Sequence, residues 1–191
     1  MNVVFRQDDE RARVFVDTTW GRSTWGSPPA SMLNAIGAPL DHGPALPWSL
    51  PSTFAEVPRL QLPPPVAEVL SVEDGGRHLA RVRLRSQRGA PTLALLLTGK
   101  RYVDVNVDGH RAMPRAAPGG MMLALHAVPS EGVVVELESP GTSGPISFTL
   151  LDRSTGVPAG TKAADAVRSR PNEATAFQDG DVTIVTTHAS L

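Results

Sequence analysis

The side chains in this sequence best suited to metal binding and acid–base chemistry are its five histidines, His42, His78, His110, His126 and His188. None of them lies in a His-x-Asp, His-x-His or His-Glu-x-x-His pattern, the short spacings that bring metal ligands together locally. The sequence contains no cysteine, which removes thiolate ligands, thiolate nucleophiles and disulfides together. We therefore predict no catalytic, cofactor or metal site from local spacing. An enzyme assembled from scattered residues would need a pocket that gathers some of these histidines.

Other short motifs are also better explained by structure than by chemistry. Residues 141–144 (Gly-Thr-Ser-Gly) do not form the Gly-x-Ser-x-Gly elbow of serine hydrolases and are typical of a loop. The glycines of residues 156–160 enclose a proline, which favours a plain turn over a nucleotide-binding loop. The adjacent Asp8, Asp9 and Glu10 could suggest a cation site. A hairpin tip explains them better, because exposed turns favour solvated aspartate.

The basic side chains gather in one stripe, formed by Arg81, Arg83, Arg85 and Arg88. One interpretation is a patch for an anionic partner. The alternative is the solvated face of a sheet, on which the arginines pair across strands with carboxylates such as Glu136 and Glu138. We favour the second interpretation.

The three tryptophans, Trp20, Trp25 and Trp48, all precede residue 58 in a segment of irregular pattern. Exposed tryptophans on a β-sandwich could stack on sugar rings, so a glycan-binding or adhesive module is the alternative function. The simpler interpretation is that the tryptophans anchor an irregular segment on a sandwich, since large aromatic side chains are more often buried.

Composition narrows the fold and the partners. With 18 prolines and 17 glycines in 191 residues, the sequence leaves little room for long helices and favours short strands joined by turns. The formal net charge of −1 gives no broad positive field for nucleic acid or an acidic membrane surface. The start of the chain has no apolar segment typical of a signal peptide, and no apolar run is long enough to span a bilayer. We expect no nucleic-acid partner and no direct membrane insertion.

The hydrophobic pattern predicts an all-β fold, an antiparallel β-sandwich preceded by a β-hairpin and a Pro-rich irregular arm. The hairpin is expected at residues 2–7 and 12–17, and a short helix at residues 30–36. Polyproline-like residues 58–65 suggest a boundary between a first part, residues 1–62, and a sandwich, residues 63–191. The expected sandwich strands are residues 66–73, 77–86, 92–98, 101–107, 121–128, 132–138, 145–151 and 181–187. A helical turn is expected near residues 163–167.

Three of these strands alternate cleanly between apolar and polar residues. Val82 and Leu84 alternate with arginines, Val105 and Val107 with Asn106 and aspartates, and residues 133–138 repeat the pattern with glutamates. Strands with one buried and one solvated face are typical of antiparallel sheets. Glycine pairs and Asp-Gly at residues 75–76, 108–109 and 119–120 suit tight turns.

Several segments, in their order along the chain, resemble the C-terminal region of bacterial membrane-anchored zinc aminopeptidases of metallopeptidase family 28. The similarity begins with the hairpin of residues 3–17, which resembles the hairpin that follows the transmembrane helices of that family. It continues through residues 62–66, 69–71 and 81–90, and in the tail through residues 156–158, 168–171 and 181–186. Each segment is short, and the weight of the resemblance lies in their order.

The resemblance implies a β-rich domain that closes such a protein outside the cytoplasm, after a two-zinc peptidase domain and hydrophobic helices. This sequence has neither the His-x-Asp pair nor the Glu-Glu pair that would supply zinc ligands and the general base. The resemblance therefore implies a non-catalytic accessory domain of a hydrolase, whose partners are the catalytic peptidase domain and membrane helices of a parent protein. We expect this chain alone not to be an enzyme. The resemblance leaves open whether the chain is a piece of a longer protein or is encoded alone.

Overall fold

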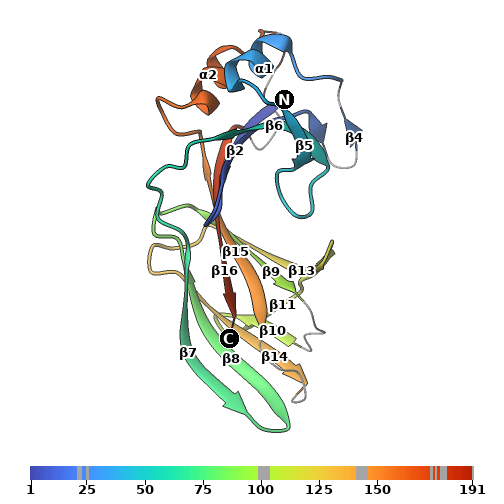
Figure 1. Ribbon diagram of the computed structural model, residues 1–191. Coiled ribbons are helices and arrows are strands. Elements are labelled where there is room, and N and C mark those ends of the chain that lie inside the picture. Colours follow the sequence, from blue (N-terminus) through green and yellow to red (C-terminus); the bar gives the residue numbers. More distant parts are fainter. Residues whose placement is uncertain are drawn as a thin grey trace. The chain divides into compact units, whose positions relative to one another are not determined.

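The computed structural model describes residues 1–20, 23–24, 26–98, 104–140, 146–172, 174, 176 and 180–190. The chain forms two compact units. The N-terminal unit comprises residues 1–61 and 153–184, and the sandwich unit comprises residues 62–152 and 185–191. The described residues are mostly in antiparallel strands with two short helices, so the predicted all-β class is confirmed (Figure 1).

The N-terminal unit is a sheet accompanied by both helices. Its elements are β1 (Asn2–Gln7), β2 (Ala12–Asp17), β3 (Thr19–Trp20), β4 (Ser23–Thr24), α1 (Ala30–Ile36), β5 (Asp41–Pro44), β6 (Pro51–Val57) and α2 (Lys162–Arg168). Neighbouring strands follow the order β1-β2-β6-β5, and β3 pairs with β4 alone. The predicted hairpin is confirmed, with Phe5 opposite Val14, and so is the short helix α1. The segment expected to be irregular contains two further strands, β5 and β6.

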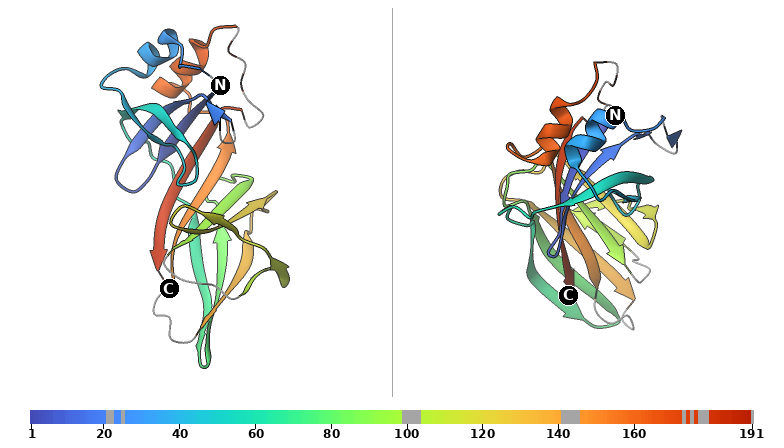
Figure 2. Two further views of the ribbon diagram at one scale, coloured as in Figure 1. Left: turned by 90° about the vertical axis from the view of Figure 1, so that its right-hand side faces the viewer. Right: turned by 45° about the horizontal axis from the view of Figure 1, so that its top comes forward.

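The core of the N-terminal unit lies between the sheet and the helices. Helices α1 and α2 lie side by side and contact β1 and β2 (Figure 2). Met32 and Ile36 of α1 and Ala163 and Ala166 of α2 are buried. Thr161 begins α2 as its N-cap, because its hydroxyl accepts a hydrogen bond from the backbone N–H of Ala164 at 3.4 Å. Neither helix in the described residues is long enough and apolar enough to cross a membrane.

The acidic cluster predicted to be a hairpin tip joins β1 to β2. The Asp8 carboxylate accepts hydrogen bonds from the backbone N–H groups of Glu10 at 3.0 Å and Arg11 at 2.8 Å. Burial by itself raises the pKa of Asp8, but these two hydrogen bonds, with the charges of Arg6 and Arg13, outweigh it and lower the pKa below its ordinary value. The cluster is therefore a turn that Asp8 closes, as the sequence indicated.

The lowered pKa of Asp8 makes the stability of this hairpin depend on pH. A carboxyl group with a lower pKa in the folded state than in the unfolded state stabilises the fold fully above the unfolded pKa, and that contribution is lost as pH falls through the folded pKa. We expect wild type to be more stable than Asp8→Asn near neutral pH and to lose this advantage in acid. Urea unfolding across that pH range measures it. Asp9→Asn is the control, and an equal loss in both variants would contradict the assignment.

The sandwich unit consists of two sheets. Its elements are β7 (Val66–Asp74), β8 (Arg77–Arg85), β9 (Thr92–Thr98), β10 (Asp104–Val107), β11 (His110–Ala112), β12 (Arg115–Ala117), β13 (Gly120–His126), β14 (Val133–Pro140), β15 (Ser147–Thr155) and β16 (Val182–Ser190). The order is β11-β10-β14-β8-β7 in one sheet and β12-β13-β9-β15-β16 in the other. Strands β15 and β16 contribute residues to both units.

The core of the sandwich unit lies between the two sheets. One sheet supplies residues such as Val82, Leu84 and Val135, and the other supplies residues such as Leu95 and Leu150. All five side chains are at most 1% exposed. Each predicted sandwich strand corresponds to an observed strand, but the predicted residues 86, 127–128, 132, 146 and 181 lie outside the observed strands. Residues 101–103 and 145 of the predicted strands lie outside the described residues.

The basic stripe lies on the solvated face of β8. Arg81 pairs with Glu136 of β14 at 3.0 Å, and Arg83 pairs with Glu68 of β7 at 3.4 Å. The prediction that arginines of this face pair across strands is confirmed. The fourth arginine of the stripe, Arg88, lies beyond the strand and is part of a buried network described below.

Candidate functional site

The five histidines do not converge on one place. His42 lies on β5, His78 on β8 and His188 on β16, whereas His110 begins β11 and His126 ends β13. Of these, His110 and His126 line the same cavity. Among the described residues, no three His, Asp or Glu side chains are grouped as metal ligands would be.

One hollowed part of the sandwich unit lies where the chain passes from one sheet to the other. Strand β11 is the outermost strand of one sheet, and β12 is the outermost strand of the other. Only Met113 and Pro114 separate them along the chain. A cavity of about 450 Å³ and a second of about 680 Å³ share Arg111, Ala112 and Met113 as lining residues. We call these two cavities together the crossover groove.

The crossover groove has an apolar lining. Met113 is 88% exposed, the highest value among the exposed large hydrophobic residues of the described chain. The other apolar residues that line the groove are Val105, Val107, Ala112, Pro114, Met121, Met122, Leu123, Ala124 and Leu125. Methionine is flexible and polarizable, so methionine-rich surfaces adapt to partners of different shape. This lining suits binding of an apolar side chain.

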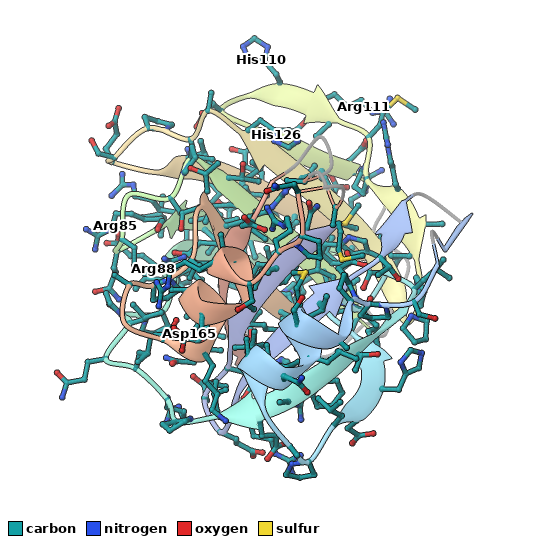
Figure 3. The ribbon with its side chains drawn as sticks, turned by 90° about the horizontal axis from the view of Figure 1, so that it is seen from above. Arg85, Arg88, His110, Arg111, His126 and Asp165 are labelled. Carbon is teal, nitrogen blue, oxygen red and sulfur yellow. The ribbon has the colours of Figure 1, made fainter. Side chains whose placement is uncertain are left out.

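The charged residues of the groove differ in how far they are already paired. Arg111 pairs with Asp104 at 2.8 Å. The Asp108 carboxylate accepts a hydrogen bond from the backbone N–H of Val134 at 2.9 Å, which fixes the turn between β10 and β11. Arg115 is exposed and has no ion-pair partner within the part of the chain that the structure describes. Figure 3 shows Arg111 and His110, neighbours on β11, directed to different sides of the strand.

A third, smaller cavity, of about 340 Å³, carries hydroxyl groups beside a histidine. Thr149 Oγ1 lies 2.9 Å from Nδ1 of His188, and Ser147 Oγ lies 3.1 Å from Ser190 Oγ. A hydroxyl nucleophile needs a base that a third group orients. The residues that line this cavity include no carboxylate, so they do not supply such a group. The crossover groove is therefore the stronger candidate.

Segments near the end of the chain meet at Asp181 in the N-terminal unit. We call this set of contacts the Asp181 junction. Asp181 Oδ1 accepts a hydrogen bond from the backbone N–H of Val3 at 2.8 Å and pairs with Arg170. The backbone carbonyl of Asp181 accepts a hydrogen bond from Gly156 N–H at 2.7 Å, and the Thr183 hydroxyl donates to the Gly156 carbonyl at 2.8 Å. The junction thus joins four separate stretches of the chain.

A buried polar network holds the turn between β8 and β9. The Asp152 carboxylate is fully buried and binds the Ser86 hydroxyl at 2.5 Å and the Arg88 guanidinium at 2.6 Å. The Ser86 oxygen in turn accepts backbone N–H groups of Arg88 at 3.2 Å and Ala90 at 3.0 Å. Gln87 in the same turn donates to the Pro64 carbonyl at 2.9 Å. These contacts tie the turn between β8 and β9 to Asp152 of β15.

The tryptophans of the alternative function can be placed only in part. Trp48 lies in the loop after β5 and is partly buried. Trp20 ends β3, but its side chain and all of Trp25 lie outside the described residues. The structure therefore gives no tryptophan platform among the described side chains.

A comparison with protein-family models finds none that matches the chain, and a search among curated proteins finds no match either.

Proposed function

We propose that this chain is the non-catalytic accessory domain that closes a membrane-anchored zinc aminopeptidase. In this role it lies outside the cytoplasm and stabilises or positions the catalytic domain, or shapes access to it. Its partners are the catalytic peptidase domain and the membrane helices of the parent protein.

The observation that carries the proposal is the Asp181 junction. The resemblance to the peptidase family lies in the order of short segments, and these segments contact one another in the structure. Val3 belongs to the first segment, while Gly156, Arg170 and Asp181 belong to the three tail segments. The contacts of the Asp181 junction give a physical reason why the first segment and the three tail segments occur together in one fold.

The middle segments of the resemblance support the proposal in the same way. Gln87 of residues 81–90 hydrogen-bonds to Pro64 of residues 62–66. Ser86 and Arg88 of the same segment hold Asp152. Residues of the middle segments thus close a turn and join strands, which is the structural role expected of a non-catalytic domain.

The first test is a peptidase assay on the purified chain. We expect no release of N-terminal residues from peptides, with or without added zinc. Circular dichroism typical of β-sheet would show that the inactive sample is folded. Robust zinc-dependent release of N-terminal residues from peptides would refute a non-catalytic role.

The second test identifies the parent. A tag placed on this sequence at its native locus should recover, in the same polypeptide or in a stable complex, a domain with a His-x-Asp pair and a Glu-Glu pair. Peptide mass spectrometry identifies that domain, and aminopeptidase activity should co-purify with it. Recovery of the folded chain with no such domain would contradict the proposal.

A further inference from the structure

Strand β7 carries a row of exposed apolar side chains at the edge of the sandwich unit. It is the outermost strand of its sheet (Figure 1). Val69 is 50% exposed, Val72 43% and Leu70 39%, so β7 holds three of the five exposed large hydrophobic residues of the described chain. Single exposed apolar residues are ordinary, but several together on an unpaired strand edge are typical of an interaction surface.

Two of these side chains belong to the core-facing side of the sheet. Val69 lies opposite Val82 and Val72 lies opposite Ala80 on β8, and both of these β8 residues are at most 1% exposed. Side chains directly opposite each other in a sheet point to the same face. The apolar layer of the core therefore continues onto β7 and ends there uncovered. A further strand beside β7 would place side chains against Val69 and Val72.

Two opposite charges near this edge also lack a partner among the described residues. Glu73 on β7 and Arg85 at the end of β8 are exposed, and neither forms an ion pair in the part of the chain that the structure describes. Arg85 lies opposite Val66, the first residue of β7, whereas Glu73 is near the other end of that strand. The two ends are about 20 Å apart, which is too far for the charges to meet within one copy.

We propose that β7 pairs with β7 of a second copy of this chain, antiparallel and about a two-fold axis. An antiparallel arrangement brings the start of one β7 beside the end of the other. Val66 then lies opposite Glu73 of the second copy, with both on the solvated face. Ala67 lies opposite Val72 of the second copy, with both on the core-facing side. These faces match because the β-bulge between Val69 and Ser71 shifts the alternation of the strand by one residue.

This register joins the unpaired groups of the two copies. Arg85 of one copy and Glu73 of the other lie on the same face, on either side of Val66. Their Cα atoms are about 10 Å apart, twice the spacing of neighbouring strands, and long arginine and glutamate side chains bridge that distance. The two-fold axis forms the contact twice, and Val69 and Val72 of the two copies cover one another. Charge and apolar surface both select a second copy as the partner, and this dimer does not rest on the proposed function.

Sedimentation equilibrium of the complete chain over a range of concentrations tests the proposal. We expect a reversible equilibrium between monomer and dimer. Glu73→Arg and Arg85→Glu each replace two attractive contacts with two repulsive ones, so each should raise the dimer Kd about tenfold. Mixing the two variants in equal amounts should restore dimerisation, because the mixed dimer places opposite charges at both contacts.

Glu131→Arg is the matched control, since Glu131 is an exposed glutamate in the turn before β14 and lies on neither β7 nor β8. It makes the same charge change as Glu73→Arg and should leave the dimer Kd unchanged. Thermal unfolding followed by circular dichroism should show that all three variants are folded. Hydrogen exchange locates the interface, because the amides of β7 should exchange more slowly as the protein concentration rises.

A chain that stays monomeric at every concentration would overturn the proposal. So would a dimer that ignores both charge reversals, a mixture that dimerises no better than its components, or an equal effect of Glu131→Arg. Slow exchange of the β7 amides in the monomer would show that another part of the protein already covers this edge, and it would overturn the proposal too. None of these outcomes bears on the peptidase assay, so the two proposals fail separately.

Discussion

Replacing Asp152 with alanine is expected to lower the free energy of unfolding by about 3–5 kcal/mol. This is the range observed when one member of a buried ion pair is removed. The carboxylate is fully buried and binds both Ser86 and Arg88. Its loss leaves the Arg88 guanidinium, with a side chain only 11% exposed, without that counter-charge. Urea unfolding followed by circular dichroism measures the change.

Asp165→Ala is the matched control for this substitution. Asp165 also pairs with an arginine, Arg168, but its side chain is 51% exposed and the pair lies on the surface of α2. Exposed pairs contribute at most about 1 kcal/mol, so the control should cost far less. If the two variants lost equal stability, Asp152 would not hold the turn as described.

Replacing Gly120 with alanine should destabilise the sandwich unit by about 3 kcal/mol or more, because it forces an atom into a packed backbone. A Cβ atom at this position would lie 1.9 Å from the carbonyl oxygen of Leu97 on β9. Neither atom belongs to a flexible side chain that could move away, so β9 and β13 would have to separate. Thermal unfolding should show a large drop in the midpoint, with loss of β-sheet signal at lower temperature.

Gly76→Ala is the control for Gly120, since it adds the same methyl group in the turn between β7 and β8. A Cβ atom there would have nothing within 4 Å. Surface substitutions of this kind usually change stability by less than about 0.5 kcal/mol. A Gly120→Ala protein as stable as Gly76→Ala would show that β13 approaches β9 less closely than the structure indicates.

The sequence predicted the sandwich strands well where alternation was strong. Val133, Val135 and Leu137 are buried, whereas the residues between them are only partly buried. The same rule did not find β5 and β6, because their residues include Gly43, Pro44 and Pro51, which are poor strand formers. Pairing with β2 places β6 in the sheet, a tertiary contact that local pattern does not contain.

The groove was not predictable from the sequence. Its residues come from β10, β11, β12 and β13, and the strands β11 and β12 are only three residues long each. Such short strands carry no readable alternation. The methionines Met113, Met121 and Met122 were a compositional signal, but only the passage of the chain between sheets brings them to one edge. The Asp152 network was also not predictable from local pattern, because the partners of Asp152 lie 64 and 66 residues away along the chain.

The division into two units has a consequence for proteolysis. The chain changes unit after residue 61, after residue 152 and after residue 184. A single cut within the polyproline-like residues 58–65 would therefore release neither unit as an independent product. The fragment after the cut still contains residues 153–184, which belong to the N-terminal unit. Nicked protein should migrate as one species until it is denatured.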